Sequence, residues 1–454
     1  MFKHAIKRRQ LLARLAIGAG LLSINGWVAS CGNGSSSAMT TEEHISSWIK
    51  QQAHPVKTTD PQAPIQDLTA LRPLIGPASI VGLGEATHGS HELFTLKQRL
   101  IEFLVTSLGF TTLAWEMDWE TGLWLNDYIH NGKGNPKDML YFPLKAQEVL
   151  DTLEWLRAYN ADPRHQQKVR CIGLDLAASS WLYTQVTQYV QNSFPKLYPT
   201  VEDAYSDFRS LTARNNISEY AQLPQNVREQ YDRQAQSVVN LLQEHQTEFE
   251  LHSLPTQFAL ALQHARVIAQ YTRVQSKAGK DNFNAHDIAM ADNATWAHQM
   301  YGKTIIWAHN SHIGKQTDVP QFYDHVMGEH LQQRFGKQYL AIGQSFNQGE
   351  MNAAVLTQGA RPVVRTFTVP PARPSSYNAL LGKTGYTTYL LDLRQAPEPA
   401  HTWLQNPHPY LDGPASLDPT QPIEKQIYGS SSWSQTFDLI MHTQQVTAAH
   451  TLGI

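Results

Sequence analysis

Glu85 and His88 stand three residues apart, directly after the short apolar run 79–84. An imidazole titrates near neutral pH, so histidine is the side chain best suited to accept a proton there. A carboxylate on the second ring nitrogen fixes the tautomer and stabilises the imidazolium that forms. The pair is therefore the first candidate for a base that activates a nucleophile.

Three further apolar runs end in side chains of the same types. The second run ends at Glu116, the third at Asp175, and the fourth leads into His309 and His312. In open parallel sheets, ligands bind in the crevice beyond the carboxyl ends of the strands. We therefore expect all four strand ends to converge on one site.

The sequence favours water as the nucleophile. It contains no Gly-x-Ser-x-Gly motif, and Cys171 falls inside a predicted apolar strand. For an ester, His88 would deprotonate water, and a second histidine or Lys97 would support the developing oxyanion. The sequence does not decide whether His88 or His309 takes the first proton.

A metal site is the chemical alternative. Its ligands would come from two His-x-x-His pairs and two glutamates: His88 with His91, His309 with His312, and Glu85 and Glu116. These residue types suit zinc or iron. The pattern is weakly specific in a chain with 20 histidines, and His91 falls at the start of a predicted helix.

Strands and helices alternate along the part of the chain that must position these side chains. Apolar runs typical of buried strands cover 79–84, 111–115, 169–174, 304–308, 339–343, 387–391 and 437–442. Helical spacing covers 40–53, 91–108 and the stretch around 149–159. This order predicts an α/β fold, with a mostly parallel β-sheet covered by helices on both faces.

Residues 193–279 differ from this pattern. They are polar and glutamine-rich, with apolar residues at helical spacing, and they are long for a single crossover. We predict an inserted helical subdomain there, with 67–192 and 280–454 forming the α/β catalytic core. The alternative is a set of crossover helices within one domain.

The first 66 residues are predicted to address and tether the protein. Lys7 to Leu12 resembles a twin-arginine export signal, and Val28 to Cys31 resembles a bacterial lipobox. We predict a signal peptide over 1–30 and a tether and N-terminal helix over 31–66, with lipid on Cys31. The protein would be an exported bacterial lipoprotein, anchored in a membrane and facing the periplasm or the cell exterior.

Charge argues against nucleic acid as a partner. The five cations of residues 1–30 have no acidic neighbours in that segment, and removing them lowers the formal net charge from −3 to −8. An acidic chain without a basic block is a poor nucleic-acid binder. We expect a monomer that acts on a small-molecule ester or lactone.

A run of motifs resembles the erythromycin esterase family over roughly residues 65–445. The segments that carry the resemblance, in chain order, are Asp67-Leu68, Ile80 to Glu92, Ala114-Trp115-Glu116, Trp155 to Asn160, Gly173-Leu174-Asp175, Asp287, Met290-Ala291, Asn293 and Trp307 to His312. The resemblance implies an α/β core with a helical subdomain, a cleft between them, and metal-independent attack of water on an ester, as in macrolide lactone opening. No cofactor is expected.

The resemblance carries over Glu85, His88, Glu116, His309 and His312 as expected active-site residues. Together with the residues near the strand ends and in the matched motifs, they give two sets of candidates. The catalytic candidates are Glu85, His88, Glu116 and His309, and the substrate-binding candidates are His312, Lys97, Asp175, His91 and Asp287. Lys97 stands where the family has arginine, and His286-Asp287 stands where it has Arg-Asp. Lysine lacks the bidentate fork of arginine, so both differences bear on macrolide specificity.

We therefore predict an ester hydrolase that opens a macrolide-like lactone or cleaves another ester. Two alternatives remain at the level of sequence. One is a metal-dependent hydrolase or an enzyme that modifies extracellular polysaccharide. The other is a surface-tethered protein that binds a ligand in the cleft without turnover.

Overall fold

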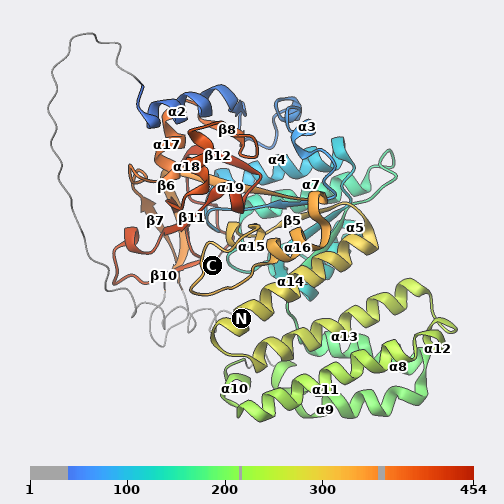
Figure 1. Cartoon of the computed structure of the whole chain (residues 1–454). Coiled ribbons are helices and arrows are strands. Elements are labelled where there is room, and N and C mark those ends of the chain that lie inside the picture. Colours follow the sequence, from blue (N-terminus) through green and yellow to red (C-terminus); the bar gives the residue numbers. More distant parts are fainter. Residues whose placement is uncertain (1–38, 214–216, 356–362, 454) are drawn as a thin grey trace, which may run out of the picture.

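A ten-stranded sheet organises the part of the chain that this computed structural model describes, residues 39–213, 217–355 and 363–453 (Figure 1). Its main path has the strand order β1-β8-β12-β6-β2-β5-β3-β4, and β7 and β10 pair with β6. The strands are β1 (His54–Pro55), β2 (Ile80–Leu83), β3 (Thr112–Asp118), β4 (Arg170–Asp175), β5 (Thr304–Trp307), β6 (Tyr339–Val355), β7 (Val363–Val369), β8 (Thr388–Asp392), β10 (Ser416–Leu417) and β12 (Leu439–Val446). A separate hairpin joins β9 (His408–Leu411) to β11 (Tyr428–Ser431).

The centre of the sheet is parallel. Strands β4, β3, β5, β2, β6 and β12 run in one direction, whereas β8, β1 and β7 are antiparallel to their neighbours. The predicted mostly parallel sheet is thus confirmed. Because β2 and β5 are adjacent, the loops that follow them leave the sheet side by side.

Alternation along the strands divides the core into two layers. Val81 and Leu83 face one apolar cluster, and Ile80, which precedes them, faces the other. The first layer is covered by α3 (Leu71–Ile75), α4 (His91–Leu108) and α7 (Gln147–Ala161). The second is covered by α2 (Thr41–Gln52), α14 (Gly279–Tyr301), α16 (Met327–Phe335), α17 (Tyr377–Leu381) and α18 (Ala400–Gln405). Strands that are buried on both faces have continuous apolar sequences, which is why these strands can be predicted from the sequence.

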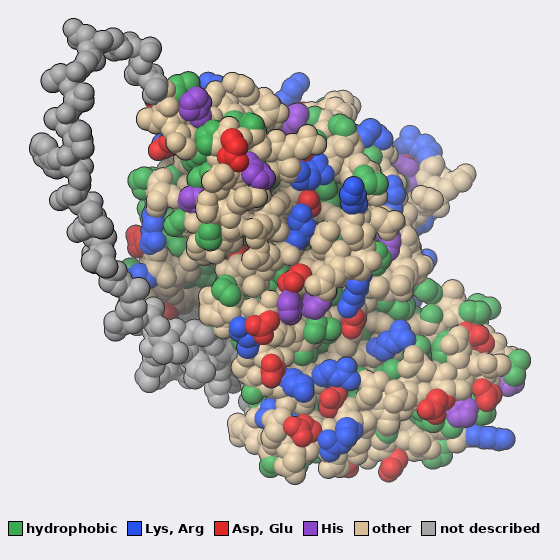
Figure 2. Space-filling view, in the orientation of Figure 1, with side chains coloured by type: hydrophobic (Ala, Val, Ile, Leu, Met, Phe, Trp, Pro, Cys, Tyr) green, Lys and Arg blue, Asp and Glu red, His purple; other side chains and the backbone are tan. Residues whose placement is uncertain are grey.

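The helices between β4 and α14 form a layer of their own, at the lower edge of Figure 1. They are α8 (Ser180–Ser193), α9 (Tyr198–Ala213), α10 (Ile217–Gln222), α11 (Gln225–Glu244), α12 (Gln246–Glu250) and α13 (Pro255–Ser276). Positive and negative side chains are interspersed over this layer in Figure 2. The boundary of a separate subdomain at residues 193–279 stays a prediction, because α8 packs into the same apolar cluster as α13.

Helix α14 connects this helical layer to the sheet. Met290, Ala291 and Ala294 pack on the sheet, whereas Trp296 and Ala297 pack into the helical cluster. A helix that is apolar on two sides is buried between two layers. Asp287 therefore reaches the sheet from a helix that also contacts the α8–α13 layer.

The remaining helices are short or lie at strand ends. They are α5 (Trp119–Asn131), α6 (Pro136–Met139), α15 (Asn310–Ile313) and α19 (Trp433–Thr436). Of these, α15 matters most for the site, because it begins directly after His309.

Two strands differ from their predicted lengths. The strand predicted over 339–343 is β6, which continues through Val355. Gln344 does not end it, because this residue is buried and hydrogen-bonds Asn310 and Leu93. The strand predicted over 111–115 is β3, which continues through Glu116 to Asp118 with a register shift against β4. Both extra lengths contain polar residues that hydrogen-bond inside the fold. A search for apolar runs therefore ends each strand too early.

The predicted export signal and Cys31 lie outside the described residues. Helix α2 begins at Thr41, and Thr40 and Glu43 form a capping box there. Among the helices of the described ranges, none is long and apolar enough to cross a membrane.

Candidate active site

Glu85 and His88 form a buried pair in the loop after β2. His88 Nδ1 donates to Glu85 Oε1 at 2.5 Å, and Glu85 is 1% exposed. The loop packs tightly against α15: Asn310 N donates to Glu85 O, and a Cβ at Gly84 would lie 2.1 Å from Asn310 Oδ1. The strand end that the sequence predicts to be catalytic thus holds its imidazole in one orientation.

The second carboxylate oxygen of Glu85 accepts two hydrogen bonds. Lys97 Nζ donates at 2.9 Å and Trp307 Nε1 at 3.0 Å. Burial raises the pKa of Glu85, but Lys97 and His88 more than offset this and hold it below its usual value. Glu85 is therefore a carboxylate at neutral pH, and His88 keeps its orienting acceptor.

Lys97 contacts the Glu85 oxygen that His88 does not contact. Its side chain is fully buried, and Nζ donates to Glu85 and to the carbonyl oxygen of Ala308. Burial lowers the pKa of Lys97 to about 8, opposed by Glu85. In this structure the ammonium positions Glu85, and binding of substrate or an oxyanion by Lys97 stays a prediction.

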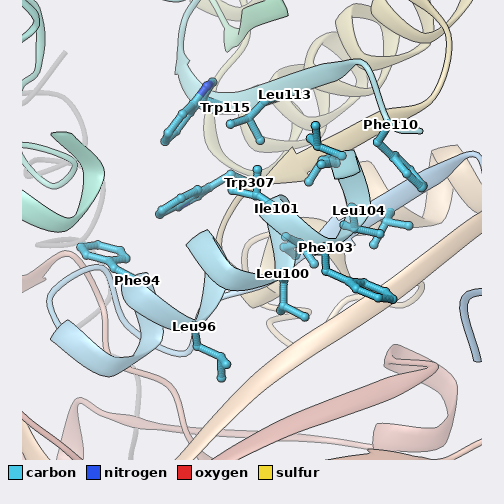
Figure 3. Packing of buried hydrophobic residues seen from close by; sticks show 14 of the residues in the cluster. Phe94, Leu96, Leu100, Ile101, Phe103, Leu104, Phe110, Leu113, Trp115 and Trp307 are labelled. Carbon is cyan, nitrogen blue, oxygen red and sulfur yellow. The ribbon is translucent and has the colours of Figure 1, made fainter. Parts of the chain in front are cut away.

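Aromatic side chains pack together beside this ion pair, and Figure 3 shows three of them, Phe94, Trp115 and Trp307. Trp307 stacks on Trp115 with ring centroids 4.7 Å apart, and Phe94 lies 5.7 Å from Trp307. The Lys97 ammonium lies 4.7 Å from the Trp307 ring centroid. A low-dielectric wall of this kind strengthens the attraction between Lys97 and Glu85 and excludes water from it.

His309 faces His88 from the loop after β5, with ring centroids 4.8 Å apart. Its backbone N donates to Glu116 Oε2 at 2.7 Å, and its Nε2 lies 3.2 Å from Asp412 Oδ1. The convergence of β2, β3 and β5 that the sequence predicts is thus present in the geometry.

The hydrogen bonds assign different tautomers to the two histidines. His88 donates from Nδ1 to Glu85, so its Nε2 carries the lone pair in the neutral ring. His309 Nδ1 accepts from the backbone N of Ser311 at 3.3 Å, so its proton is on Nε2, the nitrogen that lies near Asp412. One ring is thus a base and the other a donor.

A chain of alternating carboxylates and imidazoles continues from Glu116 to Asp175. His312 Nε2 lies 3.5 Å from Glu116, and its Nδ1 donates to Asp287 at 3.0 Å. His286 Nε2 donates to Asp175 at 2.7 Å, and its Nδ1 lies 3.5 Å from Asp287. The structure therefore groups Asp175, Asp287 and His312 behind Glu116.

Both histidines of this chain are charged at neutral pH. Burial lowers the pKa of His312, but Asp287 and Glu116 more than offset it and raise it to about 9. Asp175 and Asp287 likewise raise the pKa of His286 to about 10 against its burial. The pKa of Asp287, buried but paired to both rings, falls to about 2. This part of the site carries fixed charges, whereas His88 is placed to exchange a proton.

His91, a predicted substrate-binding residue, belongs to a different group. Its Nδ1 donates to Glu148 Oε1 at 2.6 Å, and His450 Nδ1 donates to the same atom at 2.8 Å. His91 begins α4, and this turns its ring toward α7 and the C-terminal tail while His88 turns toward Glu85. Of the residues in the metal alternative, only His91 joins a three-residue cluster of possible ligands within the described ranges, with Glu148 and His450.

Two members of the site escape sequence reasoning. Asp412 follows β9, a strand that the hydrophobic pattern does not predict, and its neighbour Gly413 donates to Ala86 O. His286 stands out in the sequence only as a departure from the family pattern. A turn-forming Asp-Gly pair is the one signal that marks Asp412.

Cys171 does not compete as a nucleophile. It lies in β4 with a fully buried side chain, and burial raises the pKa of its thiol to about 12. A protonated thiol is a weak nucleophile.

Comparisons with a family model and with a known protein both relate this chain to erythromycin esterases. The family model for erythromycin esterase matches residues 105–446. The chain is also 24% identical to erythromycin esterase type II of Escherichia coli over 382 residues, which cover 77% of this chain and 89% of that protein.

Solved structures share the fold. A Bacillus cereus protein is 34% identical, with a TM-score of 0.85 over 91% of this chain and 100% of its own. A succinoglycan biosynthesis protein is 33% identical, with a TM-score of 0.80 over 92% and 100%. An erythromycin esterase mutant, EreC, in its open conformation is 18% identical, with a TM-score of 0.70 over 87% and 97%, and shows that the fold is erythromycin esterase-like.

Proposed function

Because this chain belongs to the erythromycin esterase family, we propose that it hydrolyses a carboxylic ester by attack of activated water. The observation that carries the proposal is the adjacent pair of rings: His88, oriented by Glu85, lies beside His309 at 4.8 Å with the complementary tautomer. A base and a proton donor that lie side by side suit acyl transfer to water.

The steps follow from the tautomers. His88 Nε2 removes a proton from water, and the hydroxide attacks the ester carbonyl carbon. As the carbonyl oxygen becomes negative, the Nε2–H of His309 exchanges its contact with Asp412 for a hydrogen bond to that oxygen. His88 then returns the proton to the alkoxide as the carbon–oxygen bond breaks, giving an acid and an alcohol. Glu85 and Lys97 are positioning residues, because they act through the His88 ring.

A macrolide-like lactone or another ester is the proposed substrate. The family supports a lactone, and the 33% identical succinoglycan biosynthesis protein supports an acyl ester on an extracellular polysaccharide as a second candidate. Tyr323 has its ring centroid 5.9 Å from that of His312 and packs on Phe283. Aromatic faces beside the charged chain suit either a macrolide ring or a sugar.

The test is an assay of purified protein against 14-membered macrolides, small esters and acylated polysaccharide. The variants are His88→Asn and His309→Asn. We expect His88→Asn to lower kcat/KM by about 1,000-fold or more. We expect His309→Asn to lower it by about 100-fold through lost oxyanion stabilisation.

Three outcomes separate the alternatives. Turnover that survives a chelator and is lost in His88→Asn supports the proposal. Turnover that a chelator abolishes in His450→Asn as well as in the unchanged chain contradicts metal-independent attack. Tight ligand binding without turnover on any substrate contradicts hydrolysis and leaves a binding protein.

We also propose export and lipid attachment at Cys31, on the strength of residues 28–31. A Cys31→Ser variant made in the native host tests this. The unchanged protein should partition with membranes and the variant should not. Equal partitioning of both contradicts the anchor.

A further inference from the structure

Three side chains outside the proposed active site converge on one point at the surface. His91 begins α4, Glu148 lies in the first turn of α7, and His450 lies in the tail after β12. Both imidazoles approach Glu148 Oε1 through Nδ1, at 2.6 and 2.8 Å, and the three ligand atoms all lie within 4.8 Å of one another. Segments far apart in the sequence thus bring two nitrogen ligands and one oxygen ligand together.

The burial pattern suits an ion better than a surface ion pair. The Glu148 side chain is 2% exposed, whereas those of His91 and His450 are 33% and 69% exposed. The backbone N of His450 also donates to this carboxylate, at 3.1 Å from Oε1 and 3.3 Å from Oε2. The open side faces solvent, where a water molecule can complete the coordination.

The ligand set selects the metal. Two imidazoles and one carboxylate are typical ligands of zinc, whereas calcium and magnesium prefer oxygen alone. The ring centroids of His91 and His450 lie 4.9 Å apart, and the ring planes meet at 72°. This arrangement lets two imidazoles share an ion. Tetrahedral zinc places ligand atoms about 3.3 Å apart. Starting from 2.6 and 2.8 Å, the nitrogens of His91 and His450 therefore need to withdraw from Glu148 by about 0.7 and 0.5 Å, and neither side chain is fully buried.

The cluster joins the tail to the loop that carries His88. Ala449 N donates to Gly89 O at 2.9 Å, and His91 N donates to Thr447 O at 2.8 Å. A Cβ at Gly89 would lie 2.1 Å from Asn352 O, so this loop has little room to shift. An ion at Glu148 would fasten the tail on which the loop rests.

We propose that His91, Glu148 and His450 form a zinc site, completed by water, that fixes the C-terminal tail against the loop after His88. The site is structural and separate from the proposed hydrolysis, so either one can fail without the other. Zinc bound there supplies no step of the reaction.

The test uses the full chain with no histidine tag, stripped with chelator and dialysed. Zinc is added, and the bound metal is counted by mass spectrometry after gel filtration. The variants are His450→Asn and Glu148→Gln, and the matched control is His401→Asn, an exposed histidine on α18. Circular dichroism of each variant checks that it is folded.

We expect one zinc ion per chain in the unchanged protein and in His401→Asn. His450→Asn and Glu148→Gln should weaken zinc binding at least about tenfold. Zinc at about 100 times its Kd should raise the Tm by about 3 °C. Hydrogen exchange over 86–91 and 447–451 should slow with zinc in the unchanged protein only.

Cobalt gives a readout of the ligand set that does not depend on a variant. Tetrahedral Co²⁺ absorbs in the visible, and the unchanged chain should show these bands. Equal zinc in the unchanged chain and in His450→Asn would overturn the proposal, because the ion would then lie elsewhere. Failure of the unchanged chain to bind zinc would overturn it as well, leaving a clip held by hydrogen bonds.

Discussion

His88 and His91 are three residues apart, and each donates from Nδ1 to a buried glutamate at nearly the same distance, 2.5 and 2.6 Å. The glutamates are Glu85 and Glu148. Beyond the pair itself, the two surroundings differ. Glu85 is neutralised by the fully buried Lys97, whereas Glu148 receives a second imidazole, that of the largely exposed His450.

The difference shows that a histidine–carboxylate pair does not define a function. His88 lies beside His309, a ring of complementary tautomer. His91 faces His450, which approaches the same carboxylate oxygen. Two nitrogens converging on one oxygen suit a cation, and two adjacent rings of complementary tautomer suit proton transfer.

The largest expected effect is a difference in kcat/KM between variants of the two histidines, His88 and His91. His88→Asn should lower kcat/KM by about 1,000-fold or more, because the general base is lost. His91→Asn should change it by less than about tenfold, since this ring is bound to Glu148. Steady-state kinetics on any ester that the chain cleaves measures both. Similar losses in the two variants would contradict the separation of the two regions.

The second effect compares the two glutamates by stability. Glu85→Gln leaves Lys97 charged in a site with no exposure, and should lower the free energy of unfolding by about 3–5 kcal/mol. Glu148→Gln keeps an acceptor for solvent-accessible rings, and should cost about 1–2 kcal/mol. Urea denaturation gives both values. The double variant Glu85→Gln/Lys97→Met should regain part of the loss, and no recovery would disprove the ion-pair explanation.

The third effect is a pH dependence confined to the Glu85 region. Lys97, whose pKa is about 8, is charged below that pH and loses its proton above it. Turnover should therefore fall as pH rises through 8, because Glu85 loses its cation. Lys97→Arg keeps the charge, so the fall should move up by about one pH unit or more.

A pH–rate profile of kcat tests this, with His450→Asn as control. The control should keep the fall near pH 8, since His450 has no contact with Lys97 among those found in the structure. An unchanged fall in Lys97→Arg would assign it to another group.

The smallest effect concerns the tail. In the presence of chelator, His450→Asn should lower the free energy of unfolding by about 0.5–1.5 kcal/mol, the value of one hydrogen bond at the surface. Thermal or urea denaturation with chelator measures it. A loss of several kcal/mol under those conditions would mean that the tail is held by more than this contact.

Much of the fold follows from local pattern. The segments 80–83, 112–115 and 304–307 are largely apolar because both faces of a parallel sheet are buried, and the helical spacing of α4 is clear from Leu93 to Leu104. Glu85, His88 and His309 follow such strands, so their convergence could be inferred before their geometry was known. The polar part of β6 and the strands β7, β9 and β11 could not, since their residues lack that pattern.

The sequence by itself determined which residues are available for chemistry and at which edge of the sheet they lie. It did so because strand direction and side-chain period are local properties. Only the tertiary structure decided that Lys97 supports Glu85, that Asp412 meets His309, and that His91 joins Glu148 and His450. Each of these pairs joins distant segments or depends on which way a ring turns, and packing of the whole chain settles both.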